Sequence, residues 1–336
     1  MVDARGSTTL RAEPWSDADR LFRSDPRWLG SDDAYSVPLG DEKTLWLFGD
    51  TFVDGSSRRD ARFIRNSVGI QRGSDPTRAT IGFTWDRAPD GSFFEAPPGT
   101  WYWPLHGARV GERLLLFMMQ VRSPAGGSGA IDEWRELGAL GFFDVFGWAA
   151  IRVENPDDEP RAWRTMRVAE RTESIVLGAS ALVEDDHLVV FGWDERKRLS
   201  LARWPLGEID RDDLGEPERW NGSAWGTAAE PVIEHGATEF SVHRARDGAV
   251  QVQMSPPHQA LTIRRAPALI GPWTDPEIVF RPEETHRDGV FVYAGKAHPH
   301  LGDDVLVCTY ASNADVDTCL DDDSIYFPRF VRVEGA

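Results

Sequence analysis

Two acidic residues near the N-terminus have the spacing needed for chemistry on a glycosidic bond. Asp33 and Asp50 stand at the outer ends of two short apolar segments joined by a polar turn around Asp41 and Glu42. A hairpin centred on that turn places Asp33 opposite Asp50. Directly opposed side chains on one face of an antiparallel pair lie about 5 Å apart, and like charges there are destabilising. A sheet that keeps two carboxylates in this position is expected to use them, and hydrolysis of a glycosidic bond requires such a pair.

The segments that position these carboxylates belong to a pattern that recurs five times: a short strand, a tight polar turn, a strongly apolar strand and a further strand. The apolar second strands are residues 45–48, 114–118, 188–191, 250–254 and 305–308. Strand units repeated in this way are typical of a β-propeller. We predict an all-β fold, a five-bladed β-propeller formed by residues 1–336 as a single domain, with about the first 20 residues irregular. A short helix is expected over residues 132–140, after a loop at 123–129.

The first strand of each propeller blade lines the central channel, so equivalent positions in the five repeats should converge there. Counting back from each turn gives a ring of Asp33, Trp103 or Pro104, Gly178, Glu239 or Phe240, and Gly295 or Lys296. Carboxylates that accept hydroxyl hydrogen bonds and aromatic faces that stack on rings suit a neutral sugar. The candidate catalytic residues are Asp33, Asp50 and Glu239. The candidate substrate-binding residues are Asp32, Trp103, His106, Trp193, Tyr293, Lys296, His298 and Arg329.

Two catalytic pairings remain open. Asp33 with Asp50 fits the separation of about 5 Å in a retaining enzyme, whereas Asp33 with Glu239 across the channel fits the ~6.5–9.5 Å of an inverting enzyme. A neighbouring negative charge keeps a general acid protonated, so we favour Asp33 and Asp50, with Glu239 as a third carboxylate. Each also has a structural interpretation: Asp33 as a turn aspartate, Asp50 in a bulge, and Glu239 in a salt bridge.

The other candidates have open alternatives as well. Asp32 should face away from Asp33, because successive strand side chains point to opposite faces, unless the register slips by one residue. One of the three aromatic residues 101–103 is expected to stack on sugar. Lys296 and His298 alternate to the same face, and His298 could bind substrate, hold an ion or fill the axis. Arg329 is expected to pair with an acidic residue.

The composition excludes several classes of function. The net charge of −18 argues against binding a phosphate backbone. No apolar run approaches the length of a membrane span, so we expect neither nucleic-acid nor membrane partners, only a carbohydrate substrate and a monomer or weak oligomer. We expect a cytoplasmic protein, because the first 20 residues lack the apolar core of a signal peptide, or a secreted one if a leader has been removed.

Neither a metal nor a cofactor is required by the sequence. The two cysteines, Cys308 and Cys319, lack metal-ligand spacing. The acidic loop at residues 313–323 offers alternating oxygen ligands, but it lacks the glycine and closing glutamate of a calcium loop. We therefore expect no cofactor and a solvated loop, with a structural Ca²⁺ as the weaker alternative.

Several motifs resemble those of a bacterial family of five-bladed propellers that is allied in shape to arabinanase- and fructosidase-type glycosidases and includes endo-D-arabinanases. They lie at residues 32–39, 45–52, 66–67, 102–104, 220–225, 240–242, 271–274, 297–299 and 325–331. The resemblance implies a glycosidase-like site on the propeller axis, with Asp33 and Asp50 at the acidic positions of the first blade. The implied substrate is a furanose-containing, arabinan-like oligosaccharide or polysaccharide. The alternatives are a non-catalytic carbohydrate-binding propeller, or a lyase or transferase on the same scaffold.

Overall fold

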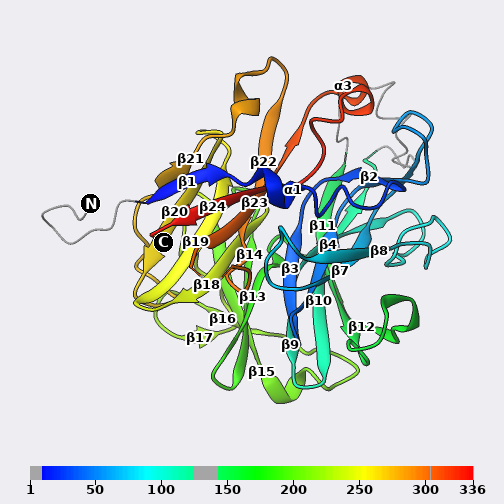
Figure 1. The fold of residues 1–336 in the computed structure, drawn as a ribbon. Helices are drawn as coiled ribbons and strands as arrows, with labels where there is room; N and C mark the ends of the chain where they lie inside the picture. Colours follow the sequence, from blue (N-terminus) through cyan, green and yellow to red (C-terminus); the bar gives the residue numbers. More distant parts are fainter. Residues whose placement is uncertain (1–9, 125–142, 303, 336) are drawn as a thin grey trace, which may run out of the picture.

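Most of the regular secondary structure of the described residues is β-strand. The computed structural model describes residues 10–124, 143–302 and 304–335, and the expected helix at 132–140 lies outside them. Within the described residues, helix is confined to α1 (Ser16–Asp19), α3 (Val316–Asp321) and three short 3₁₀ turns (Figure 1). The 3₁₀ turns are Pro160–Ala162, Leu206–Glu208 and Glu283–His286. The all-β class predicted from the repeats is therefore confirmed.

The described residues form six antiparallel sheets, five of them with four or five strands. The first larger sheet contains β3 (Tyr35–Gly40), β4 (Lys43–Phe48), β7 (Ser67–Arg72) and β8 (Thr80–Thr84). The second contains β9 (Trp101–Val110), β10 (Arg113–Arg122), β11 (Asp144–Val153) and β12 (Thr165–Arg171). The third contains β13 (Val176–Glu184), β14 (His187–Trp193), β15 (Leu199–Pro205), β16 (Glu218–Trp220) and β17 (Trp225–Gly226). The fourth contains β18 (Phe240–Ala245), β19 (Gly248–Ser255), β20 (Ala260–Ala266) and β21 (Glu277–Phe280).

The fifth larger sheet joins the two ends of the described chain. It contains β22 (Phe291–Ala297), β23 (Leu306–Asn313), β24 (Arg329–Glu334) and, at its edge, β1 (Arg11–Pro14). The expectation of an irregular N-terminal segment is therefore wrong from Arg11 onward. Without β1, the backbone N–H and C=O groups at this edge of β24 would have no partners. Strand β1 pairs with them in the register Arg11↔Glu334 to Pro14↔Val331. Strands β1 (blue) and β24 (red) lie side by side in Figure 1.

The sixth sheet is small and continues the hairpin of the first. It contains β2 (Trp28–Ser31), β5 (Thr51–Val53) and β6 (Arg62–Ile64). The chain passes from β2 into β3 and from β4 into β5, so two strands cross together from the small sheet to the larger one. Asp33 lies where the chain passes from β2 to β3, and Asp50 lies where it passes from β4 to β5.

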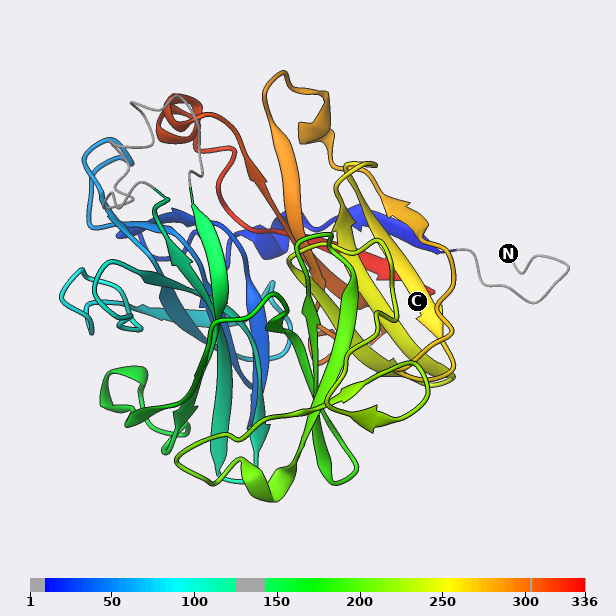
Figure 2. The same cartoon turned by 180° about the vertical axis from the view of Figure 1, so that it is seen from behind.

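The first strands of the larger sheets contact one another in chain order. Strand β3 contacts β9, β9 contacts β13, β13 contacts β18, and β18 contacts β22. A hydrogen bond of 2.6 Å between His298 Nδ1 and Ser36 Oγ links the end of β22 back to β3. Figures 1 and 2 show the sheets following one another around the molecule.

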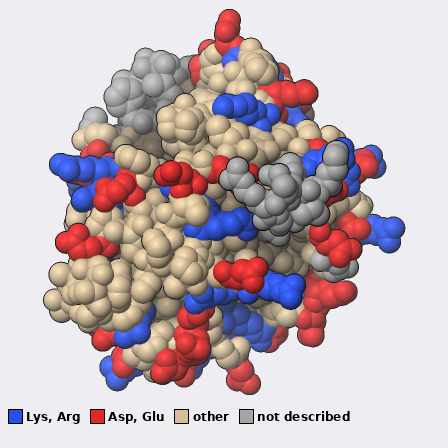
Figure 3. Space-filling model, turned by 90° about the vertical axis from the view of Figure 1, so that its left-hand side faces the viewer, with Lys and Arg blue, Asp and Glu red and all other residues tan. Residues whose placement is uncertain are grey.

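The apolar second strands form the core. They are β4, β10, β14, β19 and β23, the five strands predicted from the repeats, and they lie in the interior of their sheets. Leu45 to Phe48 of β4 are fully buried, and burial of each such side chain stabilises the fold by about 1.5–3 kcal/mol. On the side of the molecule that Figure 3 shows, charged side chains of both signs are interspersed on the surface.

Candidate active site

The β3–β4 hairpin has the predicted turn but not the predicted register beyond it. Asp41 and Glu42 have φ values of 50° and 55°, as a two-residue hairpin turn of type I′ requires. The register shifts directly after the turn, so that Leu39 is bulged and Pro38 rather than Leu39 lies opposite Thr44. A bulge adds one residue to one strand and reverses the facing of every residue beyond it.

As a result, Asp32 rather than Asp33 lies beside Asp50 along the backbone. The Asp32 N–H donates to the Asp50 carbonyl at 3.3 Å, and the Gly49 N–H donates to the Asp32 carbonyl at 3.3 Å. The predicted opposition of Asp33 and Asp50 is therefore wrong in register. Asp33 occupies the kink between β2 and β3 with a φ of 57°, a conformation that aspartate adopts more readily than most residues.

All the same, the side chains of these three aspartates line one cavity. Its volume is about 430 Å³, and Glu239 also lines it. The remaining lining residues are Gly49, Trp103, Pro104, Met119, Phe143, Thr238, Phe291, Tyr293, Asn313 and Tyr326. All three catalytic candidates, together with Asp32, Trp103 and Tyr293 from the substrate-binding set, are therefore brought together in one place.

Asp50 is held between a cation and an aromatic N–H. Its side chain is buried, Arg65 Nη1 lies 3.2 Å from Oδ1, and Trp103 Nε1–H donates to Oδ1 at 2.8 Å. Burial raises the pKa of Asp50, and the Arg65 charge and the Trp103 hydrogen bond oppose that rise. Both contacts favour the ionised carboxylate.

Asp33 forms a buried ion pair with Lys296. The ammonium group also donates to the Ala294 carbonyl at 3.0 Å and lies 4.2 Å above the centre of the Tyr35 ring. The Ala34 N–H donates to the same Asp33 carboxylate at 2.9 Å. Burial raises the pKa of Asp33 to about 6 although the Lys296 charge lowers it. Asp33 therefore holds its proton closer to neutral pH than an ordinary aspartate does.

The burial of Asp32 is offset by fewer contacts than that of Asp33 or Asp50. The Tyr293 hydroxyl donates to Asp32 Oδ2 at 3.0 Å, and Asn313 Nδ2 donates to that hydroxyl at 3.3 Å. Gly49 leaves room for this carboxylate, because a Cβ there would lie 2.5 Å from Asp32 Oδ1. Burial, and then the charges of Asp50 and Asp33, raise the pKa of Asp32 well above its ordinary value.

Glu239 approaches the cavity from the start of the fourth larger sheet. It directly precedes β18 and is partly exposed. The Thr238 hydroxyl donates to Glu239 Oε2 at 2.5 Å. The predicted salt bridge of Glu239 is not found among the ion pairs of the described residues.

Five residues predicted to bind substrate lie outside the lining of this cavity: His106, Trp193, Lys296, His298 and Arg329. Lys296 is linked to the cavity only through its ion pair with Asp33. Both ring nitrogens of His298 are occupied, by Ser36 and by Thr309 Oγ1 at 2.8 Å. His106 Nε2–H donates to the Ser36 carbonyl at 3.0 Å, and His106 Nδ1 accepts from the Ala181 N–H at 2.9 Å. Burial lowers the pKa of both imidazoles. These neutral histidines join neighbouring first strands.

The other two have their own partners outside the cavity lining. Trp193 is buried under the Lys197 ammonium group, which lies 3.9 Å from the centre of its ring. Arg329 pairs with Glu284 at 2.8 Å and with Asp19 at 3.8 Å. The prediction that Arg329 partners an acidic residue is confirmed, and its side chain does not line the cavity.

The acidic segment at residues 313–323 is folded. Asp315 caps α3 by accepting from the Thr318 N–H at 3.0 Å, and Asp317 and Asp321 pair with Arg59. Within the described ranges, no three His, Cys, Asp or Glu side chains are grouped so that they could hold a metal ion.

Several residues at the site were not predicted. Arg65 precedes the Asn66-Ser67 motif, and its position next to a motif was the one available signal. Phe143, Phe291 and Asn313 line the cavity from the starts or ends of strands, where no repeat position identifies them.

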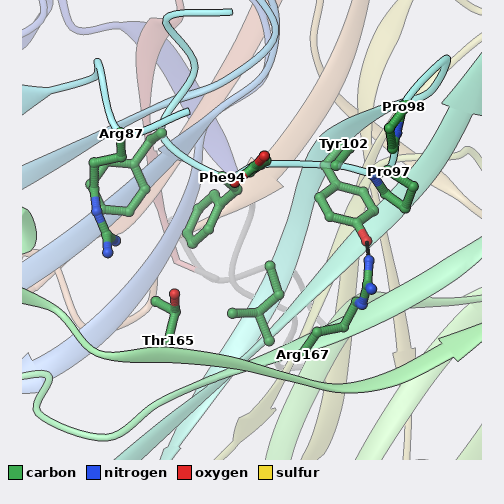
Figure 4. Close-up of a pocket in the computed structure, with 11 residues that line it drawn as sticks. Arg87, Phe94, Pro97, Pro98, Tyr102, Thr165 and Arg167 are labelled. Carbon is green, nitrogen blue, oxygen red and sulfur yellow. Dashed lines mark hydrogen bonds between the residues drawn. The ribbon is translucent and has the colours of Figure 1, made fainter. Parts of the chain in front are cut away.

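A second cavity of about 480 Å³ lies between the segment 87–98, which follows β8, and the second larger sheet (Figure 4). Phe94 and Tyr102 stand over it, Arg87 and Arg167 flank it, and the Tyr102 hydroxyl accepts from Arg167 at 3.3 Å. Glu95 is the one carboxylate among its lining residues. Chemistry that needs two carboxylates is therefore available in the first cavity and not in this one.

The chain belongs to the family described as domain of unknown function DUF5005, whose model matches residues 16–335. No curated protein matches it. Nor does the described part of the chain contain a helix with the length and apolarity of a membrane span.

Solved structures with a similar fold include several glycoside hydrolases. A candidate hydrolase from Bacteroides ovatus ATCC 8483 has a TM-score of 0.76 at 16% identity, over 99% of this chain and 93% of that one. A family 117 glycoside hydrolase from Zobellia galactanivorans has a TM-score of 0.56 at 10% identity, over 98% and 91%. The catalytic domain of a GH62 α-L-arabinofuranosidase from Coprinopsis cinerea has 0.52 at 12%, over 98% and 97%. At these identities the likeness concerns the fold.

Proposed function

We propose that the protein is a glycoside hydrolase whose active site is the cavity lined by Asp32, Asp33, Asp50 and Glu239. The observation that carries this proposal is the meeting of four carboxylates in one hollow, two of them held by a cation from a different element. Carboxylates that share a site repel one another and raise a pKa, and groups perturbed in this way are concentrated at functional sites. The fold that the chain shares with GH62, GH43 and GH117 enzymes supports the proposal.

The scaffold in this proposal is a single-domain, five-bladed β-propeller. The five larger sheets are its blades, and the small sheet of β2, β5 and β6 is an addition to the first blade. The order of contacts between first strands supports this arrangement. So does the strand β1, because an N-terminal strand that completes the last sheet closes a ring of blades.

Asp50 and Asp33 have the environments that a nucleophile and an acid/base need. Asp50, beside Arg65 and the Trp103 N–H, serves as the nucleophile and bonds to the anomeric carbon. Asp33, with a pKa of about 6, donates its proton to the departing glycosidic oxygen. It then removes a proton from the water that releases the sugar. Besides the sugar and the two carboxyl groups, water is the only reactant, so this mechanism uses no cofactor.

Glu239 offers the inverting alternative. In that mechanism Asp33 or Asp50 activates water, and Glu239, held by Thr238, protonates the leaving oxygen. The two mechanisms differ in the anomeric configuration of the first product, which proton NMR during early turnover identifies.

The substrate we propose is a furanose-containing, arabinan-like oligosaccharide. The test is to incubate the purified protein with D- and L-arabinan, fructan and xylan fragments and to measure new reducing ends. D33N and D50N should each lower turnover by at least about 10²-fold, whereas D41N, on the exposed turn of the same hairpin, should leave it unchanged. Turnover in D33N and D50N at the wild-type rate would refute the assignment. Sugar binding without turnover in the wild type would identify a binding module instead.

A further inference from the structure

The charge of the cavity limits the sugars that it can accept. The described lining residues include four carboxyl side chains, those of Asp32, Asp33, Asp50 and Glu239, and no Lys, Arg or His side chain. Three cations lie outside the lining: Arg65 and Lys296 each pair with one of these carboxylates, and Lys197, whose charge acts on Glu239, lies over the Trp193 ring. An incoming uronate or sulfate group would therefore meet carboxylates and no lining cation among the described residues. The hydroxyl groups of a neutral sugar, in contrast, can donate hydrogen bonds to these carboxylates.

Two exposed aromatic rings stand at the same cavity. The large hydrophobic residues that are exposed in the described part of the chain include only two aromatics, Phe143 at 38% and Phe291 at 43% exposure. Both line this cavity. Exposed apolar rings that gather at one hollow mark a binding surface rather than chance exposure.

Each phenylalanine rests on a second ring that hydrogen-bonds a carboxylate. Phe143 meets Trp103 edge to face, with ring centres 4.6 Å apart, and Trp103 donates to Asp50. Phe291 packs on Tyr293, with ring centres 5.5 Å apart, and Tyr293 donates to Asp32. A ring held in this way keeps its face in a fixed position, which lowers the entropy lost when a sugar stacks on it.

The two rings come from the two sheets that contact the first sheet. Phe143 immediately precedes β11 of the second larger sheet, and Phe291 begins β22 of the fifth. The first sheet, whose hairpin carries Asp33 and Asp50, contacts the second through β3 and β9 and the fifth through Ser36 and His298. A ligand that reaches both phenylalanines would therefore occupy the same cavity as the aspartates.

The geometry points to a neutral oligosaccharide of at least three sugar units as the substrate. One unit stacks on Phe143, one on Phe291, and at least one further unit lies between them at the aspartates, where the cleaved bond is held. The protein would therefore cut internal bonds of a chain rather than remove single terminal sugars. This inference rests on the proposed glycosidase function, but its binding component can be measured without turnover.

The test uses D50N, in which turnover is suppressed, and calorimetric titration with neutral hexasaccharides of arabinan, fructan and xylan. A hexameric oligogalacturonate is the anionic probe. We expect at least one neutral hexasaccharide to bind and the oligogalacturonate not to bind. Adding F143A or F291A should weaken binding by about 3- to 10-fold each. F143Y and F291Y keep the ring face and should retain affinity, and I278A, at an equally exposed residue outside the cavity, should have no effect.

The outcomes separate the two proposals. Binding by D50N without hydrolysis by the wild-type protein would refute the glycosidase function and leave the stacking surface standing. Hydrolysis with unchanged affinity in both alanine variants would refute the stacking surface alone. Binding of the oligogalacturonate as tight as that of the neutral chain, release of single sugars only, or no binding of any hexasaccharide would each overturn the inference.

Discussion

The ion pair between Asp33 and Lys296 predicts a large and partner-dependent loss of stability. Lys296 is 1% exposed and Asp33 is 9% exposed, so neither charge can be solvated if the other is removed. Breaking a buried pair by removing one partner costs about 3–5 kcal/mol. We expect K296M to lower the free energy of unfolding by that amount, because Asp33 then remains buried near Glu239 without its cation.

The double variant D33N/K296M should be more stable than K296M. It removes both charges and leaves side chains of similar size, so its cost should be about 0–2 kcal/mol. The coupling energy between the two positions is then about 1–3 kcal/mol or more. Surface variant D41N is the control and should change the stability by less than about 0.5 kcal/mol.

Urea unfolding at pH 7.5, followed by tryptophan fluorescence, measures five proteins: the wild type, K296M, D33N, D33N/K296M and D41N. A loss below about 1 kcal/mol in K296M, or a double variant whose cost is the sum of the single costs, would refute the buried pair. The same variant has a kinetic consequence if Asp33 is the proton donor. Loss of the ammonium group raises the pKa of Asp33 above about 6, so the alkaline limb of kcat/KM should move to higher pH.

Three further results are expected. W103F removes the N–H that donates a hydrogen bond to Asp50, so kcat should fall by about 10-fold or more. W101F, which deletes a buried N–H without a partner, should leave kcat unchanged, and equal effects would contradict the assignment. Burial lowers the pKa of His106, His243 and His300 to about 4, so the unfolded chain takes up these protons first and the contribution of the neutral histidines to stability is lost between pH 6.5 and pH 4. Asp33 acts in the opposite sense over this range, because its pKa is raised to about 6. D33N removes that opposing effect, so its melting temperature should fall more steeply from pH 6.5 to pH 4 than that of the wild-type protein, and equal slopes would count against these two assignments. Deletion of β1 should lower the melting temperature, because it uncovers the edge of β24, and differential scanning calorimetry measures the change.

The repeats predicted the strands well because burial decides them. All five apolar second strands are found in the interior of sheets, where each needs a continuous hydrophobic run. The two-residue turn at Asp41 and Glu42 was also predictable from its position between the strands. The N-terminal strand β1 was missed, because its short sequence carries no apolar alternation and its pairing with β24 is a tertiary contact.

The sequence indicated which residues line the cavity better than it indicated how they are arranged. Irregularities in the first strands explain the difference, because they are set by packing against neighbouring sheets. The bulge at Leu39 exchanged the positions of Asp32 and Asp33 relative to Asp50. A second irregularity between Tyr293 and Lys296, with Ala294 at a φ of 54°, separates Tyr293, which lines the cavity, from Lys296, which lies behind it.

The separation of Asp33 and Lys296 in the sequence has a consequence for folding. Asp33 lies near the start of the described chain, whereas its cation Lys296 lies 263 residues later, in β22 of the last sheet. A chain that ends before β22 cannot form this ion pair, so Asp33 is left without its counter-ion. We expect chains shortened in this way to be less stable than those that contain the last sheet.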